Sequence, residues 1–580
     1  MTRFLFPILI TTRSRPMDQQ KNYIIAIVLS VAILLGFQFF VDTPRHRTPP
    51  ADNQAQNQLT APTKPAEAPP TAEIKTLPRA EALASAPRVT IDTPRLHGSI
   101  DLMGAKIDDL ALVDYHETTS PSSPEIVLLS PEGSEHPYFA EFDWSSSQPV
   151  PGPETRWSVA DTNSTLTPDH PVTLTWNNGQ GLVFERRFAI DSAYMFTLTD
   201  TVRNEGAAAA LTPTAMVERV GTPPTSGTYL LHEGPLGIID GFLQEHKYSS
   251  LKVGEPVDGT TTGGWLGITD KYWLTALIPD QKEAASVRFV HEKSDSTDLY
   301  RTLWRGSDHA LPAGGTFTHE QHIFAGAKEV DLLDHYEETL GIPRFDRAID
   351  FGWFYWLTKP IFLTLVFFHH LLGNFGLAIL LLTVIIKLVF FPLANKSYRA
   401  MSKMKLLQPE MAKLRELYGE DKAKLNQEMM ALYKRVGANP MAGCLPMVIQ
   451  IPVFFSLYKV LYVTIEMRHA PFYGWIHDLS APDPTSFANL FGLIPFTPPS
   501  LLMIGAWPLI MGATMFLQQK LSPQMADPVQ ARMFMFLPLI FTYMLAQFPA
   551  GLVIYWAWNN LLSITQQWVI MRRAAPAVAA

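Results

Sequence analysis

The sequence of 580 residues has a single cysteine, Cys444, and lacks the short motifs that mark most catalytic sites. One cysteine excludes an intramolecular disulfide and the paired-cysteine motifs of zinc and redox centres. There is no GxxxxGK[ST] loop, no GxGxxG segment that opens a helix, no HExxH pair and no GxSxG elbow. We therefore expect neither an enzyme nor a nucleotide-driven machine, and we expect no metal and no cofactor.

Two histidine strings come closest to a metal site, and each has a plainer interpretation. His319-Glu-Gln-His322 lacks the HExxH spacing and lies in a β-rich region, which favours a surface strand. His369 and His370 are adjacent, so on a helix their side chains point in different directions. An interfacial histidine pair is favoured over a metal centre there.

Acidic and basic residues are segregated along the chain. Residues 42–344 contain 23 Lys and Arg against 42 Asp and Glu, whereas the rest of the chain contains 23 against 12. Together they give the net charge of −8. An acidic block is therefore enclosed by a basic and apolar remainder, and we expect the two to meet different compartments.

The acidic block begins with a linker and continues as a β-rich domain. Residues 42–87 are rich in Pro, Ala, Gln and Thr and show no apolar periodicity, as in a linker. Across residues 88–344, short alternating stretches predict an all-β sandwich of roughly 250 residues. A structural or docking module is favoured, and sugar binding is the alternative. The strand signals lie at 172–176 and 182–188, which flank a turn at 177–181, and at 194–202, 272–278 and 286–291.

An apolar run at residues 23–41 is long enough to cross a hydrocarbon core and follows basic residues in 1–22. We interpret this run as a retained anchor. A cleaved signal peptide is the alternative, and Met17 is an alternative start.

The chain after the acidic block is dominated by apolar segments. Residues 345–372 combine aromatic residues with a proline and predict an interfacial helix. Spans in lipid must satisfy their own backbone groups, so each later apolar run is expected to be helical. With the anchor they make six predicted transmembrane helices, five of them after the β domain. These five are residues 376–393, 445–467, 501–518, 532–547 and 551–571.

Positive charges predict the orientation. Residues 394–440 contain ten Lys and Arg against five acids, and Arg572 and Arg573 lie in the tail, 572–580. The loop at 468–500 has one Arg, Arg468, and no Lys or Arg from 471 onward. We therefore expect both termini, the segment 394–440 and the loop 519–531 in the cytoplasm, and the β domain and the loop 468–500 in the periplasm.

Two lysines lie inside the predicted spans, Lys387 toward the cytoplasmic end of its span and Lys459 toward the periplasmic end of its own. Each costs about 2.5–3.5 kcal/mol to insert, with snorkelling to the nearer surface as the plainer alternative. The uncharged polar residues gather in the cytoplasmic half. Tyr555 begins a stripe of polar residues that recur every four positions of one helix and end at Gln567. Groups at one depth predict a water-filled recess open to the cytoplasm. The recess residues are Lys387, Thr383, Gln450, Gln518, Asn559 and Ser563.

The basic segment predicts a helical hairpin. Met404, Met411 and Met429 belong to apolar series with 3-4-3 spacing, one in 397–417 and one after 421. The methionines fit packing between two antiparallel helices or, alternatively, an adaptable surface for hydrophobic clients. The net positive charge suits anionic lipids or ribosomal RNA.

Seven motifs follow one another across residues 351–571. They are Thr383-Val-Ile-Ile-Lys387, Phe391-Pro-Leu, Asn439-Pro-Met-Ala-Gly-Cys-Leu-Pro446, Ile449-Gln-Ile-Pro-Val-Phe454, Phe472 with Trp475-Ile-His-Asp-Leu-Ser480, Met511-Gly-Ala-Thr-Met515-Phe516 and Phe548-Pro-Ala-Gly-Leu-Val-Ile-Tyr555-Trp556. This order of motifs resembles the YidC/Oxa/Alb family of membrane protein insertases, and the preceding anchor and large soluble domain resemble its Gram-negative YidC branch.

The resemblance implies a five-helix insertase core, a periplasmic supersandwich and a hydrophilic groove with a basic residue. That residue is usually Arg and is Lys387 here, which keeps the charge but loses the bidentate fork. It also implies a hydrophobic slide for the client, which we assign to Phe454, Met511, Met515, Tyr555 and Trp556.

The activity that the resemblance implies is insertion and folding of inner-membrane proteins. The implied partners are nascent membrane proteins and the Sec translocon. The ribosome, the signal-recognition pathway and anionic lipids are further candidates, although the short tail lacks a long basic extension. A secondary transporter and a scaffold for membrane complexes are the alternatives; a transporter is expected to show inverted repeats, which are not evident.

Overall fold

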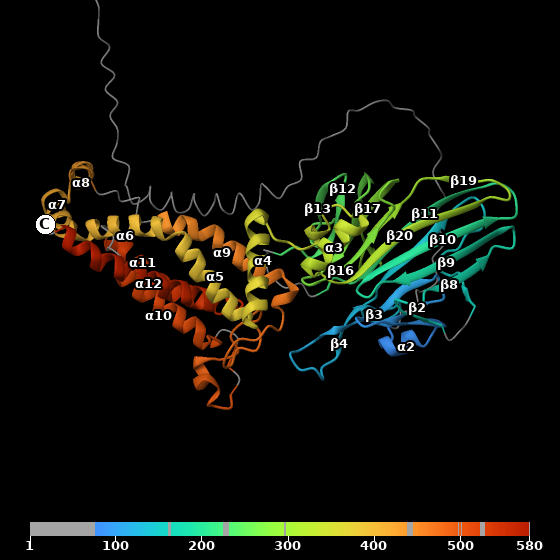
Figure 1. Cartoon of the computed structure of the whole chain (residues 1–580), viewed down its shortest axis with the longest axis horizontal. Coiled ribbons are helices and arrows are strands. Elements are labelled where there is room, and N and C mark those ends of the chain that lie inside the picture. Colours follow the sequence, from blue (N-terminus) through green and yellow to red (C-terminus); the bar gives the residue numbers. More distant parts are fainter. Residues whose placement is uncertain are drawn as a thin grey trace, which may run out of the picture. The chain divides into compact units, whose positions relative to one another are not determined.

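A computed structural model describes residues 76–160, 164–223, 231–294, 297–437, 445–496, 498–499, 502–521 and 528–578 (Figure 1). The predicted anchor at 23–41, Cys444 and most of the linker lie outside the described residues. The described chain begins as a β-sandwich and continues, from residue 330, as a series of helices.

Two large sheets form the β domain, as the alternating stretches predicted. Pairing is antiparallel throughout the described strands except between β1 and β7. The 11-stranded sheet runs β14 (Val257–Thr262), β17 (Ala284–Ser294), β18 (Thr297–Arg305), β11 (Ala209–Val220), β5 (Tyr138–Ser145), β3 (Lys106–His116), β2 (Leu96–Asp101), β1 (Arg88–Asp92), β7 (Thr165–Leu166), with β19 (His309–Leu311) on β11 and β4 (Glu125–Leu129) on β3. The 9-stranded sheet runs β13 (Phe242–Glu245), β12 (Gly234–Ile239), β15 (Trp265–Thr269), β16 (Trp273–Ile278), β20 (Thr316–Ala327), β10 (Met195–Asn204), β9 (Leu182–Ile190), β8 (Val172–Asn177), β6 (Ser158–Val159).

The predicted hairpin shows how local sequence sets the register. Strands β8 and β9 pair with Trp176 opposite Phe184, and side chains along β9 alternate between the core and the surface. In the connecting turn Gly181 has φ 101°, and a Cβ there would lie 2.5 Å from the backbone nitrogen of Gly206. Only glycine fits this turn without strain.

The end of the predicted linker is folded. Residues Arg79–Leu83 form a short helix, α2, whose Ala82 is buried and whose Arg79 pairs with Asp109 of β3. The composition of 42–87 gave no sign of this helix, because its contacts are to a strand distant in sequence.

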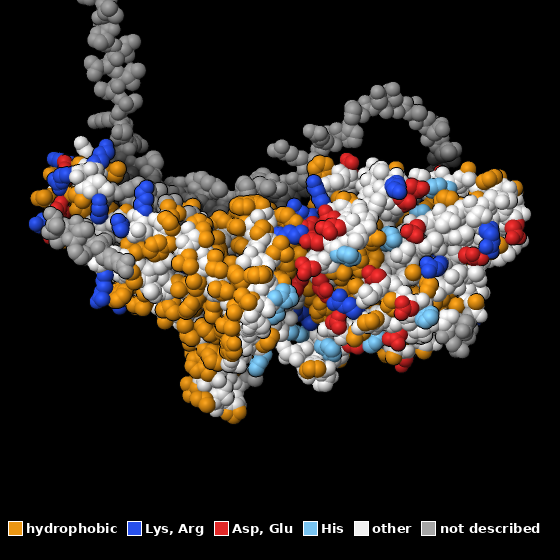
Figure 2. Space-filling model, viewed as in Figure 1, with side chains coloured by type: hydrophobic (Ala, Val, Ile, Leu, Met, Phe, Trp, Pro, Cys, Tyr) orange, Lys and Arg blue, Asp and Glu red, His pale blue; other side chains and the backbone are white. Residues whose placement is uncertain are grey.

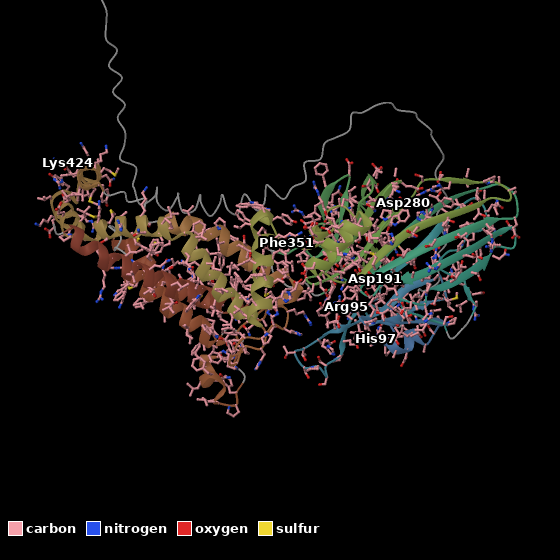
Figure 3. All side chains as sticks on the ribbon, viewed as in Figure 1. Arg95, His97, Asp191, Asp280, Phe351 and Lys424 are labelled. Carbon is pink, nitrogen blue, oxygen red and sulfur yellow. The ribbon has the colours of Figure 1, made fainter. Side chains whose placement is uncertain are left out.

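Helix α3 (Val330–Leu340) leaves β20 and is fastened to the sandwich by polar contacts. The hydroxyl of Tyr336 donates to Asp191, and Arg95 pairs with Glu329 immediately before the helix. Arg95 and Asp191 are labelled on the β domain in Figure 3. A 3-10 turn, Phe345–Ala348, then leads toward Phe351 and the apolar helices.

The helical region follows the predicted order with shifted boundaries. The second predicted span ends early: α5 stops at Val389 and α6 starts at Phe391 with a bend of 67°. Pro392 accounts for the break, because it has no N–H and its ring clashes with a preceding carbonyl. The helices are α4 (Tyr355–Leu372), α5 (Phe375–Val389), α6 (Phe391–Leu406), α7 (Gln408–Tyr418), α8 (Lys422–Val436), α9 (Leu445–Val463), α10 (Ala506–Leu521), α11 (Pro528–Leu545) and α12 (Ala550–Val578), with 3-10 turns at Ile465–Met467 and Phe487–Gly492.

Across the described residues, no single helix is both long and apolar enough to cross a membrane, whereas α5 and α6 meet that condition together as a bent pair. The number of six spans therefore stays a prediction.

The basic hairpin forms, but its first arm is not one helix. Pro409 separates α6 from α7, because a proline there cannot continue the backbone ladder of α6. Helices α7 and α8 pack through the predicted methionines, and Lys424, labelled in Figure 3, lies on α8. The buried cluster consists of Leu407, Met411, Met429 and Leu432, with Met404, Leu414, Leu425 and Tyr433 against it.

Candidate functional site

A small cavity of about 40 Å³ lies beside the bend between α5 and α6. Its volume suits one ordered water molecule. Four elements contribute to it: α5, α6, the start of α9 and the second half of α12. The lining residues are Ile386, Lys387, Phe390, Leu393, Ala394, Tyr398, Gln450, Val453 and Gln566.

Lys387 provides the charge of this cavity. Its Nζ donates a hydrogen bond to Ser563 Oγ at 2.9 Å, so two of the predicted recess residues meet. Ser563 Oγ in turn donates to the carbonyl of Asn559 at 2.8 Å. No carboxylate in the described ranges lies within 4.0 Å of Lys387 Nζ. The cation therefore has a hydroxyl partner and no described counter-ion.

The second lysine of the predicted spans has a different environment. Lys459 Nζ lies 2.8 Å from a carboxylate oxygen of Asp350, which precedes α4. Its hydrocarbon chain also lies against Gly352. An ion pair to a residue outside the apolar helices explains why this lysine is tolerated, and it separates Lys459 from the cavity.

Gln450 and Tyr555 form the other polar contact beside the cavity. The amide Nε2 of Gln450 donates to the hydroxyl of Tyr555, joining α9 to α12. Tyr555 is 2% exposed. The spacing along α12 assigned Tyr555 to the polar stripe, and the family resemblance assigned it to the slide. Its burial and its hydroxyl contact are those expected of a residue of the polar stripe.

The polar stripe of α12 turns away from the cavity along its length. Successive steps of four residues advance about 40° beyond a full turn, because an α-helix has 3.6 residues per turn. Tyr555 therefore faces α9 and Ser563 faces α5, while Gln567 Nε2 donates to the carbonyl of Leu521 in α10 at 3.1 Å. The stripe joins three helices and does not line one recess along its whole length.

The remaining predicted recess residues do not line the cavity. Thr383 is buried and donates to the carbonyl of Ile379 within its own helix. Asn559 is buried, and its Oδ1 receives no hydrogen bond from a described residue. Gln518 is half-buried on α10. Their assignment to a client-binding recess stays a prediction.

Two polar residues that line the cavity, Tyr398 and Gln566, were not found by sequence reasoning. Gln566 lies three residues after Ser563 and donates weakly to the carbonyl of Lys387, at 3.4 Å. Spacing along α12 could have identified it. Tyr398 reaches the cavity only because the chain bends after α5, and nothing in the local sequence indicates that direction.

The predicted slide residues fall into two neighbouring clusters. The rings of Phe454 and Trp556 meet edge to face at 4.6 Å, and both side chains are half-buried. Met511 is fully buried between α10, α11 and α12, and Met515 packs beside it. Trp556 borders both clusters, so the predicted residues form one continuous apolar set.

The histidine strings agree with their plainer interpretations in part. His319 lies in β20 as expected, but it is 4% exposed, so it belongs to the core and not to the surface. Burial lowers its pKa and that of His322. His369 stacks on Phe375 at 3.7 Å. Among the residues that the structure describes, no group of three His, Cys, Asp or Glu side chains is arranged to hold a metal.

Surface charge follows the segregation in the sequence. Figure 2 shows Lys and Arg gathered over the basic hairpin, Asp and Glu over the sandwich, and hydrophobic side chains over the apolar helices. The cavity thus belongs to the end of the helical region nearer the basic residues.

Comparison with known sequences gives the same division of the chain. The sequence pattern described as "60Kd inner membrane protein" matches residues 367–577, and the pattern described as "YidC periplasmic domain" matches residues 88–364. The two matches together cover nearly all of the described residues.

Similar full-length proteins share about half of their residues with this chain. "Membrane protein insertase YidC" of Methylobacterium sp. (strain 4-46) is 51% identical, with 96% of each chain covered. "Membrane protein insertase YidC" of Granulibacter bethesdensis is 50% identical, and the alignment covers 96% of this chain and 98% of that protein. A crystal structure of an active YidC insertase is 17% identical with a TM-score of 0.36, covering 83% of this chain and 92% of that one.

Proposed function

Because this chain belongs to the YidC family of membrane protein insertases, we propose that Lys387 and the cavity around it receive the polar part of a client segment. Membership confirms the resemblance seen in the motifs and the combination of a periplasmic β domain with a helical region. The path of the client, described below, is the proposal.

One observation carries the assignment of the site. Of the two lysines in the apolar helices, Lys459 is paired with Asp350, whereas Lys387 has Ser563 and no described carboxylate near it. A charge that the fold does not neutralise is costly in an apolar region and is retained there for a functional reason. An acidic or polar client flank supplies the missing counter-charge.

The size of the cavity defines what must happen next. A volume of about 40 Å³ holds water but not a peptide, so a client enters only when the lining helices separate. We propose that α12 moves relative to α5 and α9, because the polar bonds beside the cavity that join these helices are few. They are the bond of Lys387 to Ser563, the weak bond of Gln566 to the carbonyl of Lys387, and the bond of Gln450 to Tyr555. These bonds are replaced by bonds to the client and are restored afterwards.

The apolar part of the client follows a different surface. We propose that it slides along Phe454 and Trp556, with Met515 behind them, and leaves into lipid. Burial of apolar side chains in the bilayer drives this step at about 0.3–0.6 kcal/mol per large apolar residue. No nucleotide and no catalytic residue takes part, since the protein lowers a barrier and leaves the equilibrium unchanged.

Topology and partners complete the proposal. We propose cytoplasmic termini, a cytoplasmic basic hairpin and a periplasmic β domain. The ten basic residues of 394–440 suit anionic lipid headgroups at the point where clients arrive. Nascent membrane proteins are the substrates, and cooperation with the Sec translocon is the route for larger ones.

The test is insertion of a short single-span client into vesicles that contain only this protein. We expect insertion well above that of empty vesicles, and equal insertion in both would refute the activity. Crosslinking of a stalled client tests the path: adducts are expected at Phe454 and Trp556 and not at Met544, an exposed residue of α11. Adducts at all three positions would contradict a defined path.

A further inference from the structure

The loop that joins α9 to α10 was predicted to lie in the periplasm, yet its tip is apolar. Leu490, Phe491 and Leu493 are 54%, 49% and 83% exposed. Ile494 and Phe496 extend the same surface and are about half exposed. The loop protrudes below α10 in Figure 1, and hydrophobic side chains cover its end in Figure 2. An apolar patch of this kind marks contact with another apolar phase.

The backbone at the tip is held in a conformation that these residues disfavour. Leu490 has φ 50° and Phe491 has φ 58°, both left-handed, and Gly492 follows with φ 97°. Bulky residues rarely adopt this region unless their surroundings enforce it. The result is that the side chains of the tip point outward from the fold and do not collapse onto it.

A polar clamp beneath the tip enforces this conformation. Asn489 Oδ1 accepts from Gly492 N at 3.0 Å, and Asn489 Nδ2 donates to the carbonyl of Phe496 at 3.2 Å. Ser486 accepts from Phe491 N through its carbonyl at 2.7 Å. Seven backbone N–H groups between Phe487 and Phe496 donate hydrogen bonds within the loop or to its other arm. These bonds lower the free-energy cost of bringing the backbone of the tip close to an apolar phase, where an unpaired polar group is costly.

From residue 471 onward, the described part of the loop has no exposed carboxylate and no Lys or Arg. Residues 471–500 contain no Lys or Arg. Asp483 is 5% exposed and accepts hydrogen bonds from Trp475, Thr485 and Trp507. Asp478 accepts from Ser480. Both carboxylates of this part of the loop therefore accept hydrogen bonds from within the protein. The outer surface of the tip presents no charged group that could pair with a charged partner.

Aromatic residues surround the base of the loop. Tyr473 and Trp475 are 62% and 41% exposed, and His477 beside them is also exposed. Amphipathic rings at the base and aliphatic or Phe side chains at the tip are the distribution found where a protein crosses from headgroups into acyl chains. This ordering favours a lipid surface over a protein partner.

An apolar pocket lies between the loop, α10 and α11. It has a volume of about 600 Å³, and apolar atoms dominate its lining. Gly512 allows α10 to approach Thr542 of α11 closely, and Thr542 Oγ1 is already bonded to the carbonyl of Pro538. The lining residues are Phe487, Ile504, Leu509, Leu539, Ile540, Thr542 and Tyr543.

We propose that the loop between α9 and α10 inserts its tip, residues 490–496, into the hydrocarbon of the leaflet opposite the basic hairpin, and that a lipid acyl chain fills the pocket beside it. The choice of leaflet rests on the topology proposed above; insertion itself does not. Phe487 and Ile504 of the loop form one wall of the pocket, so the pocket adjoins the loop. The loop is thus a second anchor of the insertase core, separate from the cavity at Lys387.

The test places a fluorophore at the tip of the full chain in vesicles. The background carries Cys444→Ser, and nitrobenzoxadiazole is attached after Leu493→Cys, Leu539→Cys or Ser122→Cys. Leu539 is 68% exposed on α11 and reports lipid, while Ser122 lies in an exposed polar turn of the β domain and reports water. Vesicles contain phosphatidylethanolamine and phosphatidylglycerol with or without bromine on the acyl chains.

We expect the fluorophore at 493 to be blue-shifted and quenched by brominated lipid as strongly as at 539, and protected from aqueous iodide. Behaviour like that at 122 would overturn insertion. A blue shift without bromine quenching would mean that protein covers the tip, which also overturns the proposal. Labelling after Phe491→Cys repeats the measurement if position 493 disturbs the fold.

The pocket is tested in detergent with few lipids per protein. A fluorophore after Phe487→Cys is expected to be quenched by brominated lipid and to recover when unbrominated lipid is added. Ile540→Trp narrows the pocket and is expected to weaken this quenching severalfold. Quenching of a fluorophore after Met544→Cys, an exposed position of α11 that does not line the pocket, is expected to stay unchanged. Quenching that is equal at both positions and insensitive to Ile540→Trp would refute a pocket-bound chain. Client insertion, measured in parallel, reports separately on the function of the Lys387 cavity.

Discussion

The charge of Lys387 is expected to act on the client and not on the fold. In Lys387→Met the ammonium is lost while most of the chain length remains. Ser563 stays satisfied, because its hydroxyl already donates to the carbonyl of Asn559 at 2.8 Å. We therefore expect a change in thermal stability within the small range typical of a replacement that leaves no polar group unpaired.

The effect on insertion depends on the client. A hydrogen bond to a charged group contributes about 1.5–3 kcal/mol. If that bond forms in the rate-limiting step with an acidic client residue, Lys387→Met slows insertion roughly 10- to 150-fold. A client whose translocated flank carries no charge loses only a fraction of this rate. Lys387→Arg keeps the charge and is expected to keep the rate within a few fold.

The assay compares initial rates of protease-protected client in vesicles containing each variant. Acidic and neutral versions of one client, differing in one Asp or Asn of the translocated flank, isolate the charge. Lys459→Met is the matched control, since its partner is Asp350, and is expected to change the rates for both clients by the same factor. An equal loss for both clients in Lys387→Met would refute the reasoning, as would an unchanged rate for the acidic client.

Three further predictions concern contacts that the structure defines. The guanidinium nitrogens of Arg186 lie 2.8 and 2.9 Å from the buried carboxylate of Asp200, so Arg186→Met is expected to lower the free energy of unfolding by about 3–5 kcal/mol. Adding Asp200→Leu should recover part of this loss in denaturant titrations, and a larger loss in the double variant would contradict the pairing. Burial lowers the pKa of His232 to about 4, below the value of 6.5 in the unfolded chain, so folding favours the neutral ring. The free energy of unfolding is therefore expected to fall by about 3 kcal/mol as the pH drops from 6.5 toward 4. His232→Gln should flatten this part of the pH–Tm curve, and an unchanged curve would exclude the histidine as the cause. Gln450→Leu leaves the buried Tyr555 hydroxyl without its donor and is expected to cost about 1–3 kcal/mol; adding Tyr555→Phe should restore most of the melting temperature.

Local sequence predicted the elements with periodic patterns. The hairpin β8–β9 was recognisable because residues alternate along both strands and the turn requires small residues. The methionines of α7 and α8 were recognisable from their spacing, since packed helices present every third or fourth residue. The prediction failed where a proline interrupts the backbone hydrogen bonds of a helix. Pro392 and Pro409 each divide a segment that its apolar periodicity had predicted as one helix.

The candidate site was predicted in its chemistry but not in its geometry. Lys387, Gln450 and Ser563 were named from their polarity at one depth, and they surround or contact one cavity. Tyr398 was missed because it reaches the cavity only through the bend after α5. Gln566 was missed because the face of α12 that lines the cavity depends on how that helix packs. Lys459 resembled Lys387 in sequence, and only the contact with Asp350 distinguished them.

By itself the sequence determined the division into an acidic β domain and an apolar helical region, the family, and the kinds of side chain at the site, because hydrophobic periodicity, charge and motifs are properties of neighbouring residues. The tertiary structure decided which lysine has no carboxylate beside it among the described residues, how small the cavity is, and that the apolar tip around Leu493 is exposed and held by a polar clamp. These depend on residues far apart in the chain, whose distances follow from the packing of helices and strands and not from any local pattern.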